Sequence, residues 1–582
     1  MSLRKVHNTE ELSRRSVLKR LSQGTLPLIA ALMCLLIILV LGAGAGITER
    51  EAPGDIVATT TPAPGKADVP NQKPSEPRYP ISGYFIAGSS RDATNYKKLA
   101  DIKEFGGDTV ITFGTSLRPA SLETIPSDCV IDGRNCASVA ADSVSVNRYF
   151  TFLDGSNWND TALKCPRDRK VTNKGQSYLL LVLPAVGSSC NSPNGEYDVV
   201  VTGGSSSSAS DPSRSLAAAA TKLGMKYFAG MPAPVKRKDL TYLPDLSYET
   251  TLSLFTERFL QYQASANNVG GLAGFYHHTE MPLTDSLTFD SILALYKNQN
   301  RAIKRILPTR QAIVSPYIEA RVGKSGISAE EARLGTKRIA QTAEGLVLNI
   351  AVQDGMGTGK GGAFTSREAG SLVDPFAATI VGNGSWGAKY LAPNRDYYTA
   401  AAAGTVGTNA VLWANLEGMA PATKLNTCGD SLRGQTTKAR IDRQLQQVAN
   451  AKKVISFMWD SYFTCKGTGT PLKGQVERSL TTPIITDTSF RPGTGELQIV
   501  GFNIRGGSAR VKWTGGGGQP LEKSAVASDS DATYGLRRGL NPKLEKITLS
   551  VGSTTVNASR VYSVRVINGW GVESVEFHSQ LP

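Results

Sequence analysis

The sequence predicts a (β/α)8 TIM barrel followed by a small all-β domain and preceded by a membrane-spanning segment. From residue 81 onward, short apolar runs alternate with helix-forming stretches through eight repeats. After about residue 480 the pattern changes to alternating strands separated by glycine clusters. Residues 26–47 carry no charge and are long enough to cross a hydrocarbon core of ~30 Å. The fold class is therefore α/β with two appended elements.

The N-terminal segment predicts export. Six basic residues precede the apolar run and favour a cytoplasmic N-terminus: Arg4, Lys5, Arg14, Arg15, Lys19 and Arg20. We expect a cytoplasmic tail over 1–25, a retained anchor over 26–47 and everything beyond it outside the cell. The competing interpretation is a signal peptide cut near Ala43-Gly44-Ala45, which would give a secreted protein. Residues 48–80 are rich in Pro, Thr and Ala and predict a disordered linker.

Composition agrees with an extracytoplasmic protein. Lys and Arg total 64 against 49 Asp and Glu, and the pI near 9.4 suggests a polyanionic neighbour. Nucleic acid is not expected, because the positive charge is not gathered in basic patches interleaved with aromatic residues. Outside the apolar segment the chain has an even six cysteines, as expected in an oxidising compartment. Their spacing does not fix the pairing, but we favour Cys129–Cys136, Cys165–Cys190 and Cys428–Cys465.

The barrel is expected over residues 81–480. Its strands are predicted at 82–87, 108–113, 225–230, 274–276, 312–317, 346–352, 409–414 and 454–459. Helices are predicted between them at 94–105, 212–223, 248–268, 289–307, 328–343, 393–403 and 436–452, with Gly224 as a helix stop. A long insertion with four cysteines, 114–211, interrupts the pattern after the second strand. A closed barrel is favoured over a doubly wound sheet of eight strands.

Residues 481–582 predict an immunoglobulin-like β-sandwich. Alternating strands at 497–503, 509–513, 546–551 and 561–566 are separated by glycine-rich turns. Such a domain could bind a polymer or only cap the barrel.

Candidate site residues are those that follow the barrel strands, because the chemistry of a TIM barrel lies at the carboxyl ends of its strands. Carboxylates, amides and aromatic rings gather there, a mixture that suits a carbohydrate. The expected substrate-binding residues are Tyr84, His277, His278, Tyr317, Glu319, Gln353, Asp354, Trp413, Asn415, Trp459 and Asp460. Because side chains alternate along a strand, only one of the adjacent His277 and His278 is expected to be functional.

Glu280 and Glu417 are the expected catalytic pair. Glycoside hydrolysis needs two carboxyl groups flanking the scissile bond. Strands four and seven lie across the mouth of an eight-stranded barrel, so the glutamates that follow them can face each other. This placement resembles the barrel glycosidases whose acid/base follows strand four and whose nucleophile follows strand seven. The resemblance implies Glu280 as acid/base and Glu417 as nucleophile or base, although Thr279 stands where that group usually has Asn.

Several short motifs together resemble the family catalogued as domain of unknown function 4434, a barrel family placed near glycoside hydrolases. The motifs are SGYFIAG, GFYHHTE, VSPYIEAR, AVQDGMG and LWANLEGM. The resemblance covers roughly residues 81–470 except the insertion. It implies a sugar-active barrel without naming the sugar.

The sequence thus predicts a membrane-tethered extracellular glycoside hydrolase that acts on a cell-envelope or extracellular polysaccharide or glycoconjugate. The alternative is a non-catalytic carbohydrate-binding or envelope-organising protein on the same scaffold. No cofactor and no metal site are expected, since the chain has four His and no HExxH motif. The glycine-rich run Gly355–Gly362 lacks phosphate-loop spacing and predicts a mobile loop over the site. The oligomeric state is left open.

Overall fold

The computed structural model describes residues 76–206, 210–421, 428–430, 432–467, 469–515, 517–552 and 561–579. The predicted tail 1–25, the anchor 26–47 and the linker up to residue 75 lie outside these ranges. Within them, none of the helices is both long and apolar enough to span a membrane. Residues 236–243 group apart from the rest of the described chain, and within them the Arg237 backbone N–H donates to the Leu243 carbonyl at 2.9 Å.

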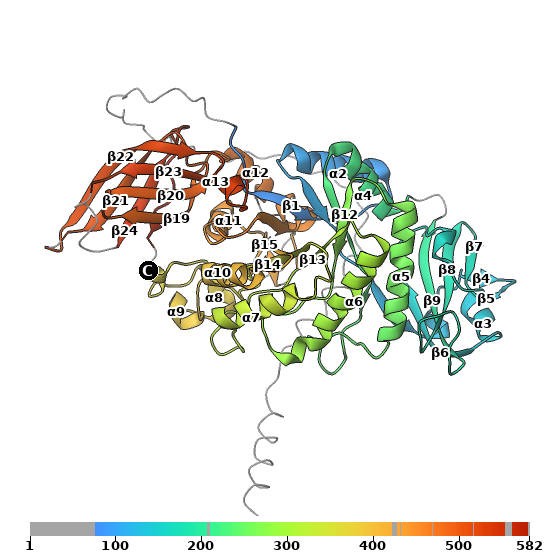
Figure 1. Cartoon of the computed structure of the whole chain (residues 1–582). Coiled ribbons are helices and arrows are strands. Elements are labelled where there is room, and N and C mark those ends of the chain that lie inside the picture. Colours follow the sequence, from blue (N-terminus) through green and yellow to red (C-terminus); the bar gives the residue numbers. More distant parts are fainter. Residues whose placement is uncertain are drawn as a thin grey trace, which may run out of the picture. The chain divides into compact units, whose positions relative to one another are not determined.

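The central body is a closed, parallel, eight-stranded barrel (Figure 1). Its strands are β1 (Ile81–Phe85), β2 (Thr109–Ile111), β10 (Lys226–Gly230), β12 (Leu272–Tyr276), β13 (Gln311–Val314), β14 (Leu348–Gln353), β15 (Ala410–Glu417) and β18 (Lys453–Phe457). The ring closes because β1 pairs in parallel with both β2 and β18. All eight predicted strands are therefore confirmed, and the doubly wound sheet is wrong.

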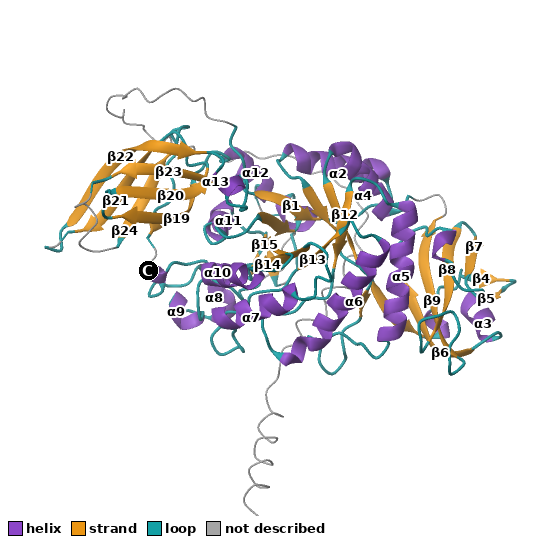
Figure 2. Cartoon of the chain, viewed as in Figure 1, coloured by secondary structure: helices purple, strands orange, loops and turns teal. Residues whose placement is uncertain are grey.

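Helices separate the strands along the chain and lie outside the barrel (Figure 2). They are α2 (Asp92–Glu104), α4 (Pro212–Leu223), α5 (Glu249–Ala266), α6 (Asp290–Ile306), α7 (Ala329–Ala340), α10 (Asn394–Thr405), α11 (Lys438–Leu445) and α12 (Leu472–Arg478); α8 (Pro375–Val381) and the single turn α9 (Trp386–Lys389) precede α10. Local sequence sets their ends. Asp211 caps α4 by accepting from two backbone N–H groups, and Gly224 ends it with a φ of +62°.

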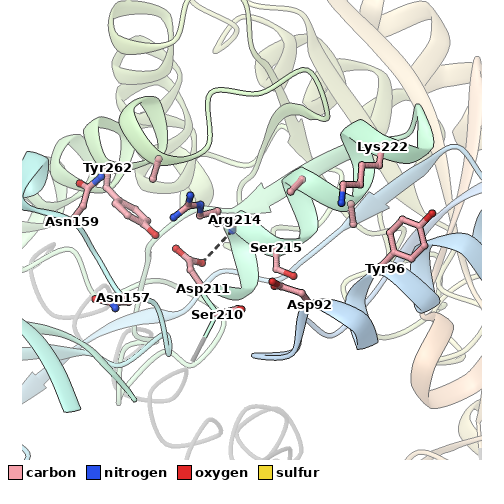
Figure 3. A pocket seen from close by; sticks show the side chains of 13 residues that line it. Asp92, Tyr96, Asn157, Asn159, Ser210, Asp211, Arg214, Ser215, Lys222 and Tyr262 are labelled. Carbon is pink, nitrogen blue, oxygen red and sulfur yellow. Dashed lines mark hydrogen bonds between the residues drawn. The ribbon is translucent and has the colours of Figure 1, made fainter. Parts of the chain in front are cut away.

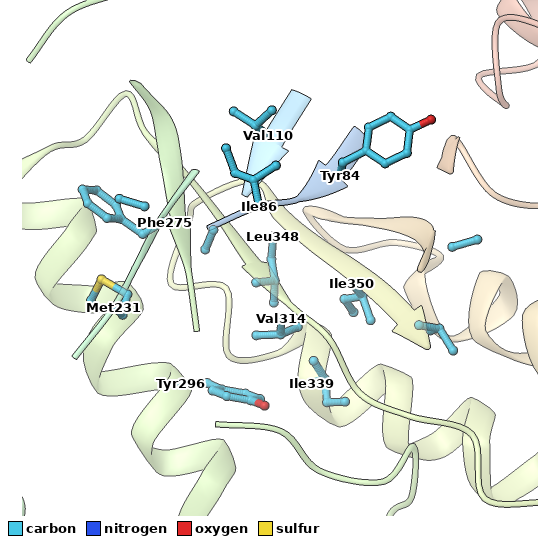
Figure 4. Close-up of a cluster of buried hydrophobic side chains, with 14 of the residues drawn as sticks. Tyr84, Ile86, Val110, Met231, Phe275, Tyr296, Val314, Ile339, Leu348 and Ile350 are labelled. Atoms are coloured by element: carbon cyan, nitrogen blue, oxygen red, sulfur yellow. The ribbon is translucent and has the colours of Figure 1, made fainter. Parts of the chain in front are cut away.

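Two hydrophobic layers follow from the alternation of side chains along the strands. Residues such as Tyr84, Phe275, Val314 and Ile350 face outward and pack against the helices (Figure 4). A second cluster fills the barrel interior with the residues that alternate with them: Phe85, Ile111, Phe228, Tyr276, Ile313, Ala351, Trp413 and Ile455. The interior is thus a packed core, and ligands must approach from one end of it.

The insertion predicted at 114–211 builds its own six-stranded sheet. The strands are β3 (Ser116–Ala120), β6 (Ser145–Phe152), β7 (Arg169–Asn173), β8 (Gln176–Pro184) and β9 (Glu196–Ser206), joined by the short β11 (Ala233–Pro234). Alternate residues of β8 belong to different hydrophobic clusters, since Leu179 and Leu181 face the barrel helices and Leu180 and Val182 face away. Burial on both faces explains why β8 is apolar from Tyr178 to Pro184. A hairpin of β4 (Val130–Ile131) and β5 (Arg134–Asn135) and the helix α3 (Cys136–Ala141) complete the insertion.

Three disulfides join the six cysteines in the predicted pairs. Cys129 is bonded to Cys136 and Cys165 to Cys190 within the insertion, and Cys428 is bonded to Cys465 near the end of the barrel. All three pairings are confirmed.

The C-terminal domain is an antiparallel sheet of seven strands. These are β19 (Ile484–Arg491), β20 (Glu496–Phe502), β21 (Ser508–Thr514), β22 (Pro520–Asp531), β23 (Glu545–Ser550), β24 (Tyr562–Ile567) and β25 (Phe577–His578), with a single helical turn, α13 (Tyr534–Arg537), before β23. The long β22 pairs with both β21 and β23, so the two halves form one continuous sheet rather than the two separate sheets of a sandwich. The sheet bends around one core, because the Tyr562 hydroxyl of β24 lies 3.1 Å from the Thr488 hydroxyl of β19.

Candidate active site

Glu417 is the last residue of β15 and the top of a row of side chains that faces the barrel interior. Below it in the row come Asn415 and then Trp413. Glu417 is only 4% exposed. The Asn415 amide donates at 3.0 Å to the hydroxyl of Ser315, the residue that follows β13, across the adjacent strand β14. Strand alternation therefore delivers Glu417 to the carboxyl end of the barrel, as the sequence predicts.

The glycine-rich loop that follows β14 covers the Glu417 carboxylate. The Thr358 backbone N–H donates to Glu417 Oε2 at 2.8 Å, and the Thr358 hydroxyl donates to the same oxygen at 3.2 Å. The approach is close enough to require glycine at position 357, because a Cβ there would lie 2.9 Å from Glu417 Cβ and 3.0 Å from Oε2. The predicted position of this loop, over the site, agrees with the structure.

Asp354 lies directly behind Glu417. Its Oδ1 accepts from the backbone N–H groups of Glu417 (3.2 Å) and Met356 (3.1 Å), whereas Oδ2 is buried with no partner among the described residues. Burial, with the neighbouring Glu417 carboxylate, raises the pKa of Asp354 well above its usual value. Burial also raises the pKa of Glu417, but the positive charges of Lys360 and Arg433 and the Thr358 hydrogen bonds oppose that rise. Burial therefore favours the protonated form more strongly at Asp354 than at Glu417.

Lys360 is the positive centre of the barrel mouth. Its ammonium lies 3.7 Å from the centroid of the Tyr317 ring, a cation–π contact. Burial lowers the pKa of Lys360, and the carboxylates of Glu417, Glu319 and Glu280 act in the opposite direction. Glu280 and Glu417, from opposite sides of the barrel, therefore lie around the same cation.

Glu280 occupies the other side of the mouth. The hydroxyl of Tyr276, whose ring belongs to the barrel interior, donates to Glu280 Oε1 at 2.9 Å. Glu280 is exposed, in contrast to Glu417. Glu319 is held by Arg321, whose Nε donates to Glu319 Oε1 at 2.7 Å. The two candidate catalytic groups thus differ in environment, one buried and one open to solvent.

The adjacent histidines separate as predicted. His277 points out of the barrel and is fully buried, with its ring nitrogens 2.6 Å from Gln299 Oε1 and 2.8 Å from Asn300 Oδ1 on α6. Burial lowers the pKa of this imidazole. His278 points inward, where Nδ1 lies 2.5 Å from the Gly114 carbonyl and its ring lies beside Phe113. Only His278 remains a candidate for substrate contact.

Three aromatic residues that we expected to bind substrate lie elsewhere. Tyr84 faces outward from β1 and packs edge-to-face on Trp459 and Phe463. Trp459 belongs to the same layer and is 3% exposed. Trp413 faces inward but lies below the mouth, beside Lys453 at the start of β18. We therefore withdraw all three as substrate contacts, because packed side chains fill the space around each.

The remaining predicted residues lie at or near strand ends. Tyr317 is half-buried under Lys360, and the Gln353 amide donates to the Ser315 carbonyl at 2.8 Å. Asp460 follows β18, where it accepts from the Ala87 backbone N–H and pairs with Lys98 at 2.6 Å. Asp460 therefore ties β18 to the loop after β1.

The sequence did not single out Thr358, Lys360, Tyr276, Arg433 or Arg440. Arg440, on α11, is 7% exposed and donates to the Met356 carbonyl at 2.9 Å, which fixes the covering loop from behind. The sequence feature that could have pointed to Lys360 is its position in the glycine-rich run Gly355–Gly362. Among the residues that the structure describes, no three His, Cys, Asp or Glu side chains are grouped as metal ligands.

Comparisons with known proteins give no family. No protein-family model matches the chain, and a search of curated proteins found no match. Weak structural likenesses include an endo-beta-1,4-mannanase from Thermotoga petrophila, at 9% identity over 87% of this chain and 98% of that one, with a TM-score of 0.35. A Bacteroides thetaiotaomicron protein provisionally named an alpha-L-fucosidase is 11% identical over 71% of this chain and 97% of that one, with a TM-score of 0.36. Endo-glycoceramidase II from Rhodococcus sp. is 12% identical over 82% of this chain and 99% of that one, with a TM-score of 0.28. At these scores the likenesses carry no argument about substrate or mechanism.

Proposed function

We propose that the chain is a glycoside hydrolase that cleaves a cell-envelope or extracellular polysaccharide with Glu280 and Glu417. The observation that carries the proposal is the shared electrostatic environment of the two carboxylates. Glu417 ends β15, Glu280 accepts from Tyr276 at the end of β12, and both carboxylates act on the Lys360 ammonium, so both lie at the carboxyl end of the barrel. Two carboxyl groups bordering one space are what hydrolysis of a glycosidic bond requires.

The two environments suggest the roles. Glu417 favours the ionised form more than Asp354 does, because Lys360, Arg433 and Thr358 stabilise its carboxylate. Glu417 then attacks the anomeric carbon, or removes a proton from a water molecule that does so. Glu280, on the open side, protonates the glycosidic oxygen as the bond to the anomeric carbon breaks. The distance between the two carboxyl groups with substrate bound decides between a retaining and an inverting outcome.

The covering loop must move for this reaction. Glu417 is 4% exposed beneath Gly357 and Thr358, so a sugar reaches it only if this part of the loop swings away. The same burial favours the alternative function, a carbohydrate-binding protein without catalysis. An experiment that measures both binding and reducing-end release on a panel of envelope polysaccharides distinguishes hydrolysis from binding without catalysis. Release supports the hydrolase, and binding without release supports the alternative.

The proposal also includes a location in the cell and a family. We propose that the segment 26–47 anchors the chain in the membrane with the barrel outside, and the three disulfides are in keeping with an oxidising compartment. Membership of the family catalogued as domain of unknown function 4434 rests on the short motifs alone.

Replacing Lys360 by methionine should move the acidic limb of the pH–activity profile to higher pH. Glu417 must be ionised to act, and the Lys360 charge lowers the pKa of Glu417 against the effect of burial. Without that charge the pKa of Glu417 rises, and activity is lost earlier as the pH falls. The profile of kcat/KM measures this. Lys337→Met, at an exposed position on α7, is the control. If the acidic limb of the kcat/KM profile fell at the same pH in both variants, the role of Lys360 would be refuted.

A further inference from the structure

A cavity lies outside the barrel, on the outer side of α4. Its volume is about 400 Å³, and α4 forms its floor between α2 and α5 (Figure 3). The lining residues are Asp92, Tyr96, Asn157, Asn159, Ser210, Asp211, Arg214, Ser215, Ala218, Ala219, Lys222, Tyr262 and Ala266. We call it the α4 groove. None of these residues belongs to the candidate active site.

Two cations line the floor. The side chains of Arg214 and Lys222 are exposed and form no hydrogen bond or ion pair with other side chains of the described residues, although the Arg214 charge acts on the nearby Asp211 carboxylate. They are eight residues apart on α4, with Ala218 midway between them, so they share one side of the helix about 12 Å apart along its axis. The small side chain of Ala218 leaves the space between the two cations open. The groove can therefore hold an extended molecule with negative charge.

Asp211 supplies an acceptor that lacks a donor. Its Oδ1 caps α4 by accepting from the backbone N–H groups of Ser213 (2.8 Å) and Arg214 (3.2 Å). Its Oδ2 is buried and unpartnered among the described residues, and the side chain as a whole is 7% exposed. A buried acceptor without a donor is costly and is expected to receive one from a ligand or water. A hydroxyl group would meet that need.

The remaining lining narrows the chemistry. The exposed carboxylate of Asp92 disfavours a dense polyanion such as a polyphosphate. Tyr96 is 45% exposed and offers an apolar ring face at the edge of the groove. The ligand must therefore combine spaced negative charges, hydroxyl donors and an apolar face. An acidic sugar combines all three.

We propose that the α4 groove binds hexuronate units of an anionic polysaccharide. One carboxylate pairs with the Arg214 guanidinium, which suits bidentate recognition, and a carboxylate further along the strand pairs with Lys222. A sugar hydroxyl donates to Asp211 Oδ2, and the ring lies against Tyr96. The site is separate from the barrel mouth and does not depend on the proposed hydrolase activity. Its use would be to hold an anionic polymer on the protein, in keeping with the formal net charge of +15.

Calorimetric titration of the full-length chain in mild detergent tests the proposal. The probes are a tetramer of galacturonate and a neutral gluco-oligosaccharide of equal length. Titrations use the Glu417→Gln background, so that turnover does not consume the probe and the failure of one site is distinguishable from the failure of the other. We expect the acidic tetramer to bind, with an affinity that falls as salt rises, and the neutral one to bind at least about tenfold more weakly.

Variants in the groove complete the test. Arg214→Gln and Lys222→Gln should each weaken binding of the acidic tetramer by about tenfold, and Lys337→Gln, on α7, should leave it unchanged. Asp211→Asn keeps an oxygen for the helix cap and replaces the free acceptor with a donor, so it should also weaken binding, with thermal unfolding as the check on folding. Equal affinity for both probes, no binding of either, or unchanged affinity in both cation variants would overturn the proposal.

Discussion

Glu417→Gln should lower polysaccharide hydrolysis by at least about 10³-fold while the protein remains folded. The amide can still accept from Thr358, but it can neither attack the anomeric carbon nor remove a proton from water. The change also removes the negative charge beside Asp354, so folding should not suffer. Initial rates of reducing-end release, with thermal unfolding in parallel, measure both effects.

Glu319→Gln is the matched control for Glu417→Gln. Glu319 also acts on Lys360, but its carboxylate is held by Arg321 and is assigned no part in the chemistry. Glu319→Gln should lower the rate of polysaccharide hydrolysis far less than Glu417→Gln. A rate loss equal to that of Glu417→Gln would mean that the Lys360 environment as a whole, and not the Glu417 carboxylate, sustains the activity.

His277→Leu should lower the free energy of unfolding by about 2 kcal/mol, because it removes the imidazole N–H that lies between two buried amide oxygens, Gln299 Oε1 and Asn300 Oδ1, and leaves at least one of them without a donor. Neither amide can turn to compensate at no cost. The Gln299 and Asn300 amino groups already donate to the carbonyls of Pro232 and Thr342, both at 2.9 Å. Urea unfolding monitored by circular dichroism measures the loss.

The neighbouring His278→Leu provides the contrast. His278 is half-buried at the barrel mouth, so its replacement should cost less stability and more activity. If His278→Leu destabilised the chain as much as His277→Leu, with activity unaffected, the division of the pair into a structural and a functional histidine would be wrong.

The barrel could be predicted from the sequence because its strands carry their signal locally. Strands such as β14 and β8 are buried on both faces and are therefore mostly apolar, and turn residues such as Gly224 mark the helix ends. The C-terminal sheet was less predictable. Its single continuous form depends on β22 pairing at both edges, which is a long-range property.

Strand alternation and the order of the strands predicted which residues of the candidate site lie at the carboxyl end of the barrel. Glu280, Glu417, Asp354 and His278 fall at the carboxyl end of the barrel. Tyr84 was misplaced because its neighbour Phe85, and not Tyr84, faces the interior, a phase that the apolar run SGYFIA does not reveal. Lys360 was missed because its position comes from the path of a loop, which no periodicity describes.

Chemical rescue of Glu417→Ala tests the central claim most directly. Removing the side chain opens a space at the position that we assign to the attacking group. Hydrolysis should be lost in this variant and turnover should return with azide, giving a glycosyl azide of inverted anomeric configuration. Hydrolysis by Glu417→Ala at the wild-type rate without azide would contradict the assignment of Glu417 and, with it, the proposed hydrolase mechanism.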